Sequence, residues 1–109
     1  MGSTASYLTS GTTTGSYIVA SILYGAEGPA HGAIVLIKNT HVSATMYYKI
    51  SLYLANEASA LESTFLAETG LAASTTADMI SITYPFYKAE ISVKQHSGAG
   101  TYQIDAITF

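Results

Sequence analysis

The sequence predicts an all-β fold, a single antiparallel β-sandwich that is jelly-roll-like. Apolar and polar residues alternate in several segments, each about as long as a β-strand. These segments recur, with turn residues between them, every 8–14 residues, which is typical of antiparallel sandwiches and barrels. A strand–helix rhythm, which would indicate a parallel α/β sheet, is missing. The length of 109 residues is that of one domain.

Residues 1–15 are predicted to form an N-terminal arm, followed by a sandwich domain over residues 16–109. The stretch 9–15 holds only Ser, Thr and Gly, so it offers few side chains to a core. Such an arm either frays or becomes ordered against a neighbouring subunit. In the second case Tyr7 and Leu8 would be its anchors.

Three strands are expected before residue 56. The first covers residues 16–24, and the turn 25–29 ends it. The nearly continuous apolar run 32–38 is typical of a central strand that is covered on both faces. The third, 42–55, alternates most clearly. Its inward residues are Met46, Tyr48, Ile50, Leu52 and Leu54, and its outward residues are Tyr47, Lys49, Ser51 and Tyr53.

The segment 56–69 supports two interpretations. A short helix near 57–68 would have Asn56 as its N-cap, Leu61 and Phe65 on one face, and Gly70 just after its end. Alternatively, residues 64–69 form another strand. Short apolar segments of this kind fit both periodicities, so the sequence leaves the choice open.

Two further strands are expected at 75–83 and 87–95. Pro85 separates them, because proline cannot donate a hydrogen bond within a central ladder. In the second strand Glu90 is outward beside Lys88 and Lys94, and we expect cross-strand ion pairs there. A hairpin-type turn is predicted at 97–100.

The last strand, 101–109, is predicted to be an edge that contacts another subunit. Asp105 is its one charged residue and it has no proline, whereas natural edges are protected by Lys, Pro or bulges. The whole chain is also poor in charge, at 10% against about 25% in ordinary domains. A surface so neutral is poorly protected against association. The candidate interface residues are Tyr7, Leu8, Tyr47, Tyr53, Tyr102, Ile104 and Phe109.

No residues in the sequence have the spacing of a catalytic, cofactor or metal site. His31, His41 and His96 fall in predicted turns, and no two of them have metal-ligand spacing. The serines lack a G-x-S-x-G context, and the carboxylates form no calcium-loop motif. We therefore expect a protein that is not an enzyme and that needs no cofactor or metal.

The charges and apolar runs also limit the partners. The four lysines are scattered and there is no Arg, so direct binding of nucleic acid is not expected. No apolar run is long enough to span a bilayer, and residues 1–6 do not resemble a signal peptide. We expect synthesis in a host cytoplasm and no membrane partner. With no Cys, disulfides and thiolate chemistry are absent.

The aromatic residues leave an alternative open. Outward tyrosines such as Tyr47 and Tyr53 could stack on sugar rings, which would make the chain a carbohydrate-binding or adhesion module. Subunit contact explains the same residues, because Tyr is enriched at interfaces. A bound glycan is therefore the alternative to a protein partner.

Several segments together resemble small β-sandwich virion proteins, such as capsid decoration or minor structural proteins of viruses and phages. They are the Ser/Thr arm, Lys38–Asn39 ahead of the strand 46–50, the corner 84–87, the strand 91–95, and the glycine turn before the closing strand at 102–104. The resemblance covers about residues 16–109 as a pattern, and no functional residue transfers. It implies a non-enzymatic, homo-oligomeric structural role in the virion, in contact with a major capsid or other virion protein.

Overall fold

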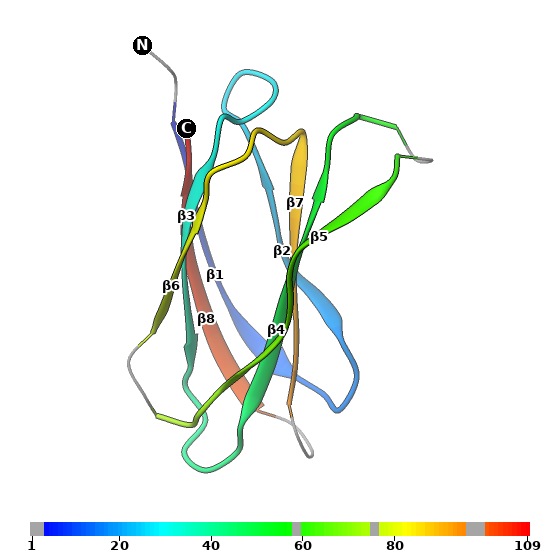
Figure 1. Ribbon diagram of the computed structural model, residues 1–109. Helices are drawn as coiled ribbons and strands as arrows, with labels where there is room; N and C mark the ends of the chain where they lie inside the picture. Colours follow the sequence, from blue (N-terminus) through cyan, green and yellow to red (C-terminus); the bar gives the residue numbers. More distant parts are fainter. Residues whose placement is uncertain (1–3, 58–59, 75–76, 96–99) are drawn as a thin grey trace.

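The computed structural model describes residues 4–57, 60–74, 77–95 and 100–109. They form two four-stranded antiparallel sheets that face each other as a β-sandwich, as predicted (Figure 1). The strands are β1 (Ala5–Thr13), β2 (Ile18–Tyr24), β3 (Ala33–Asn39), β4 (Met46–Tyr53), β5 (Glu62–Leu71), β6 (Asp78–Ile82), β7 (Lys88–Gln95) and β8 (Gly100–Thr108). Across the described residues, no helix is long and apolar enough to cross a membrane.

The strand order identifies the sandwich as jelly-roll-like. One sheet has the order β1-β8-β3-β6 and the other the order β2-β7-β4-β5. In Figure 1 the first sheet lies at the left and the second at the right. Strands far apart in the sequence are neighbours, because β1 pairs with β8 and β2 with β7. Eight strands wound in this way into two packed sheets are typical of jelly rolls.

The core lies between the sheets and consists of the inward residues of each strand. Val35, Ile37, Ile50, Ile91 and Ile104 have no exposed surface. The prediction for β4 is confirmed at its four inward positions from Met46 to Leu52, which are all buried. Leu54 differs, because it lies beyond the end of the strand and is 72% exposed.

The N-terminal segment is a strand of the sandwich where we predicted an arm. All nine residues of β1 pair with β8, from Ala5 opposite Thr108 to Thr13 opposite Gly100. The Tyr7 ring packs on the core, while its hydroxyl donates to the Tyr24 carbonyl (2.8 Å) and accepts from the Tyr24 N–H (3.0 Å). Threonine suits a half-buried strand, so a low-complexity stretch can still form a ladder. The sandwich therefore begins before residue 16.

The segment 57–68 contains no helix in its described part. Glu62–Leu71 forms β5, so the strand alternative is correct, and the strand is longer at both ends than the predicted 64–69. The segment is a strand and not a helix because it pairs with β4, with two irregularities in the pairing near Ile50. Residues 58–59 lie outside the described residues, as do residues 75–76 at the start of the predicted strand 75–83 and most of the predicted turn 97–100.

The closing strand β8 is not an edge, which corrects the prediction. It pairs with β1 on one side and with β3 on the other, so the edges of this sheet are β1 and β6. Tyr102 and Ile104, two of the candidate interface residues, point inward and are buried. A strand with few charged residues can lie at a subunit interface or in the middle of a sheet. β8 lies in the middle of its sheet.

A buried polar network closes one end of the sandwich. The Asn39 side-chain amide donates to the carbonyls of Ala44 (2.7 Å) and Leu71 (3.0 Å). The Gln95 amide donates to the same Ala44 carbonyl (2.8 Å), and its oxygen accepts from the Thr13 hydroxyl (2.8 Å). Within the described part of the chain, no buried side-chain N or O atom is without a partner. The network therefore ties β1, β3, β5 and β7 together, and its hydrogen bonds compensate for the burial of these polar groups.

Candidate functional site

The outer surface of the sheet β1-β8-β3-β6 is the most unusual surface of the molecule. Each of its four strands places at least one large aliphatic side chain there. These side chains are Leu8 (74% exposed), Ile34 (39%), Leu36 (37%), Met79 (71%) and Ile107 (38%), and we call this surface the apolar face. It corrects the prediction for residues 32–38, because β3 is covered on one face only and alternates between buried and exposed residues.

The register of the sheet brings these side chains together. Leu8 lies opposite Asp105, Asp105 opposite Leu36, and Leu36 opposite Met79, which makes one row across all four strands. Ile107 and Ile34 lie opposite each other in the next row. A shallow hollow of about 400 Å³ lies over the first three strands. The exposed aliphatic residues of this face therefore form one contiguous patch.

Two charged side chains occupy outward positions on the apolar face within the described strands. Asp105 is half-buried in the central row, and the Gln103 amide donates to its carboxylate (3.1 Å). Lys38 is exposed on β3 opposite Gln103. The ion pairs found among the described residues do not include either of them.

The outer surface of the sheet β2-β7-β4-β5 is of a different kind, and we call it the polar face. At one end of it the Tyr17 hydroxyl donates to Glu68 (2.5 Å), and Lys94 pairs with the same carboxylate (3.2 Å). The ammonium groups of Lys49 and Lys94 lie over the Tyr17 ring, at 4.4 and 4.8 Å from its centroid. Burial and the bond to Glu68 raise the pKa of Tyr17, and that same bond, followed by Lys94, lowers the pKa of Glu68.

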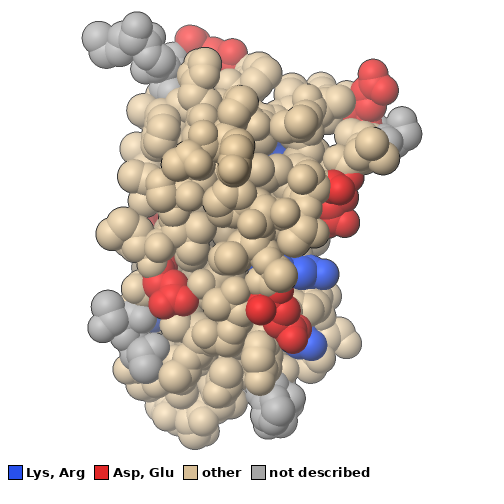
Figure 2. Space-filling model, viewed as in Figure 1, with Lys and Arg blue, Asp and Glu red and all other residues tan. Residues whose placement is uncertain are grey.

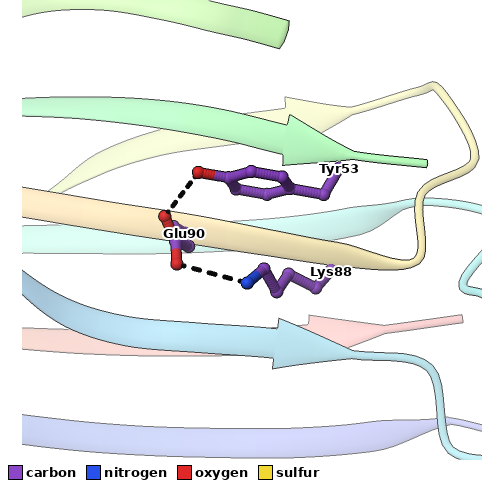
Figure 3. Close-up of polar contacts among 3 residues, drawn as sticks. All are labelled: Tyr53, Lys88 and Glu90. Carbon is purple, nitrogen blue, oxygen red and sulfur yellow. Dashed lines mark hydrogen bonds and ion pairs between the residues drawn. The ribbon is translucent and has the colours of Figure 1, made fainter. Parts of the chain in front are cut away.

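A second cluster on the polar face joins Tyr53, Glu90 and Lys88 (Figure 3). The Tyr53 hydroxyl donates to Glu90 (3.0 Å), and Lys88 pairs with the other carboxylate oxygen (3.6 Å). The hydrogen bond to Glu90 raises the pKa of Tyr53 to about 12. The prediction that Glu90 forms cross-strand ion pairs is wrong, because its partner Lys88 lies on the same strand and Lys94 pairs with Glu68 instead.

The charged side chains and tyrosines of these two clusters thus find partners within the chain, although β2 also exposes Val19 (50%) and Ile22 (37%) on this sheet. Lys88 lies 4.5 Å from the Tyr53 centroid, and Lys94 lies 5.7 Å from that of Tyr47, so each ring has a cation over one face. Such contacts occupy the ring surface that a sugar would stack on. Both tyrosines are outward, as predicted, and they are half-buried.

The remaining candidate interface residues fall in different places. Leu8 belongs to the apolar face, whereas Tyr7 turns inward. Phe109 is 41% exposed just after β8, and its backbone exchanges two hydrogen bonds with Gly32. Of the candidates, Leu8 is the one that the structure places among the exposed aliphatic residues.

The sequence reasoning missed Ile34, Leu36, Met79 and Ile107. The signal that finds them is the sheet type: in an antiparallel sandwich a continuous apolar run must turn every second residue outward. In such a fold every second residue of the run 32–38 turns outward, and the structure shows that these residues include Ile34 and Leu36.

The described histidines have different surroundings. His41 shapes a loop, because its Nδ1 accepts the backbone N–H groups of Ser43 (3.1 Å) and Ala44 (2.9 Å). His31 is exposed, and His96 lies outside the described residues. Among the residues that the structure places, no three His, Asp or Glu side chains gather as a metal site would require.

A second apolar hollow lies at the side of the sandwich where β5 and β6 are the edge strands. It measures about 690 Å³ and is lined by Leu52, Leu54, Ser63, Thr64, Phe65, Tyr84 and Pro85. The Phe65 and Tyr84 rings meet edge to face, with centroids 6.0 Å apart. Figure 2 shows this side of the molecule, whose central surface is largely uncharged. The lining has no titratable acid or base other than the Tyr84 hydroxyl, so it offers little for proton transfer.

The fold and the surfaces define the chain as a jelly-roll-like β-sandwich domain with one apolar outer face. No family model and no curated protein matches the sequence. Among solved structures, a Bacillus endospore appendage protein, from a family of disulfide-linked pili, superposes with a TM-score of 0.57 at 7% identity, over 97% of this chain and 86% of that one. The mitogen from Yersinia pseudotuberculosis gives 0.53 at 15% identity, over 97% and 86%.

A viral protein superposes less well. A chain of infectious bursal disease virus, Gt strain, gives a TM-score of 0.49 at 12% identity; the match covers 97% of this chain and 32% of that one. At these identities the comparisons establish the β-sandwich fold alone. That fold serves proteins with different roles.

Proposed function

We propose that this protein is a non-enzymatic structural subunit that assembles with copies of itself, and that it does so as a component of a virus or phage particle. The observation that carries the first part is the apolar face. A contiguous aliphatic patch on a small domain is typical of a protein contact. Each of its side chains contributes on the order of 1 kcal/mol when the remaining exposed surface is buried.

The proposed place of action, a virion, rests on the sequence resemblance to small virion proteins. Symmetric shells require subunits that present the same contact surface many times, and a sandwich with one adhesive face fits this need. A major capsid or other virion protein is then the second proposed partner. The endospore appendage protein, which has a similar fold at 7% identity, belongs to a family of pili, so a sandwich of this kind also occurs in another type of assembly.

Self-association is tested by measuring mass in solution over a wide concentration range. We expect concentration-dependent oligomers for the natural chain, and weaker association for Met79→Lys and Leu8→Lys, which place a charge on the apolar face. Val42→Lys is the matched control, because Val42 is an exposed aliphatic residue (83%) in the loop after β3, away from the sheet face. A chain that stays monomeric at millimolar concentration overturns this part of the proposal.

The virion role needs a separate experiment. Particles from the source of the sequence are purified on a density gradient, and mass spectrometry looks for the chain at a fixed stoichiometry to the major capsid protein. Stripped particles should rebind the purified chain, and Met79→Lys should rebind less. Absence of the chain from intact particles would refute the proposed location and leave self-association standing.

Carbohydrate binding is the alternative function, and the geometry favours it less. Lys88 and Lys94 cover one face of the Tyr53 and Tyr47 rings, so a sugar would have to displace a cation or use the other face. A glycan array with the natural chain and with Tyr53→Ala tests it directly. Reproducible binding that Tyr53→Ala abolishes would favour this alternative.

A further inference from the structure

We propose that two copies pair face to face through their apolar faces about a two-fold axis, with Asp105 of each copy against Lys38 of the other. This inference rests on the proposed self-association and adds the identity of the occupant and the polarity of the contact. It starts from the two charged side chains that interrupt the apolar face.

Asp105 is the first constraint on whatever covers this surface. Its carboxylate lies in the central row, flanked across the strands by Leu8 and Leu36, and within the described residues it has no cationic partner inside 4 Å. A purely apolar partner would remove this charge from water with only the Gln103 hydrogen bond as compensation, which is unfavourable. The occupant must therefore bring a positive charge opposite Asp105.

Lys38 supplies such a charge on the same face. It lies on the adjacent strand, one row away, opposite Gln103 and not opposite Asp105. Diagonal positions of this kind are about 7–8 Å apart, and the two side chains do not meet in the single chain. Lys38 is thus exposed and available to a partner.

The other three lysines are engaged on the polar face. Lys49 lies over the Tyr17 ring, Lys88 pairs with Glu90, and Lys94 pairs with Glu68. The apolar face therefore combines aliphatic side chains with one anion and one cation. A second copy of the same face is complementary to it in charge and in hydrophobicity. A two-fold axis makes both ion pairs at once, because in an isologous contact residue i meets j and j meets i.

This arrangement predicts the outcome of a mixing experiment. Asp105→Lys alone sets lysine against lysine across the axis, and Lys38→Asp alone sets aspartate against aspartate. A 1:1 mixture of the two variants restores opposite charges at both positions, in a mixed dimer. An ion pair within one chain would not be restored by mixing, so the experiment separates the two arrangements.

Dissociation constants are measured by analytical ultracentrifugation. We expect each single variant to dissociate at least ten times more readily than the natural chain, and the mixture to return within about threefold of it. A mixture of Asp105→Lys with Lys49→Asp is the matched control: Lys49 lies on the polar face, so the Lys49→Asp chain should dimerise with itself as the natural chain does, and it should not recruit the Asp105→Lys chain as Lys38→Asp does. Circular dichroism confirms that each variant is folded.

Neutral variants provide a second measurement if a charge reversal prevents folding. Asp105→Asn keeps the side-chain size and Lys38→Gln shortens the side chain slightly; each removes one charge and should weaken the dimer three- to tenfold, with a smaller salt dependence than the natural chain. A natural chain that is monomeric overturns the proposed self-association together with this inference. A natural oligomer that is indifferent to the charge variants, or a mixture no tighter than the single variants, overturns this inference alone and indicates a different occupant of the face.

Discussion

At the scale of single residues, buried polar side chains hold the ends of the strands in place. Asn39 has no exposed surface, and it satisfies two carbonyls with its amide and the His41 N–H with its oxygen (3.1 Å). Because each partner is a backbone group, the side chain fixes the chain path and not only its own position. Loss of such a residue leaves buried groups unpaired, which is more costly than the net value of the bonds.

Asn39→Ala should therefore destabilise the fold by about 2–4 kcal/mol, since the Leu71 carbonyl loses its amide partner in a buried position. The free energy of unfolding in urea measures it. Asn56→Ala, at an exposed position, is the control and should change stability by less than about 0.5 kcal/mol. Equal effects at the two positions would show that the network contributes nothing special.

Three tyrosine hydroxyls donate to carboxylates, and this makes the fold sensitive to alkali. The pairs are Tyr17–Glu68, Tyr48–Asp78 and Tyr53–Glu90. Burial and the bond to Asp78 raise the pKa of Tyr48, while the bond to Glu90 raises the pKa of Tyr53 to about 12. The folded chain thus keeps these protons at a pH where the unfolded chain has lost them.

The sign of the pH dependence follows from linkage. Below the ordinary tyrosine pKa of about 10 both states are protonated, and the stabilisation is complete. Above it the unfolded state binds fewer protons, so stability should fall between about pH 10 and 12. Urea midpoints measured from pH 8 to 12 should fall less steeply for Tyr48→Phe and Tyr53→Phe. Tyr84→Phe, at an exposed position, should leave the slope unchanged.

At the scale of elements, the start of β3 is held where three strands meet. Gly32 exchanges backbone hydrogen bonds with Phe109 after β8 (3.1 and 3.0 Å), and a Cβ at Gly32 would lie 2.5 Å from the Ile82 carbonyl oxygen at the end of β6. That atom belongs to the backbone, so a clash with it moves a strand and not a side chain.

Gly32→Ala should lower the thermal midpoint by several degrees, because overpacking at such a site costs roughly 1–3 kcal/mol. Gly15→Ala is the matched control, since nothing lies within 4 Å of the position that its methyl group would take and alanine reduces the entropy of the unfolded chain. We expect the control to be neutral or slightly stabilising. A neutral Gly32→Ala would mean that β3 and β6 can separate without cost.

The elements also show what the sequence can predict. Strands with strict alternation, such as β4 and β7, are predicted with their correct inward faces because the pattern has period two. The order of the strands in each sheet cannot be predicted in this way, because alternation shows which side chains point inward but not which strands pair. The prediction therefore places β8 at an edge although it pairs on both sides, and it treats β1 as an arm because its Ser and Thr residues lack a strong apolar signal.

The sequence predicts what kind of surface the candidate site is, but not which residues form it. The shortage of charge indicates a covered surface, whereas the residues that form it come from four strands that only the topology brings together. Leu8 and Met79 are 71 positions apart in the sequence and share one row of the sheet through Asp105 and Leu36. Long-range pairing of this type leaves no local trace in a single sequence.

At the scale of the whole molecule, the two outer faces differ in how far they are satisfied. On the polar face, lysines, tyrosines and carboxylates pair with one another within the chain. On the apolar face, aliphatic side chains are exposed, and neither Asp105 nor Lys38 takes part in the ion pairs found among the described residues. A single copy is therefore complete on one side of the sandwich and incomplete on the other, and association should contribute to its stability.

Association of the folded chain makes its unfolding temperature depend on concentration, because binding that favours the native state adds stability by mass action. For a dimer, each tenfold increase in concentration adds about 0.7 kcal/mol per chain, which corresponds to roughly 3–5 °C for a domain of this size. Scanning calorimetry over two decades of concentration should show this rise for the natural chain. Met79→Lys should reduce this rise without lowering the midpoint of a dilute sample, because Met79 is 71% exposed and contributes little to the fold of one copy. A midpoint that does not change with concentration would show that the apolar face contributes no association free energy.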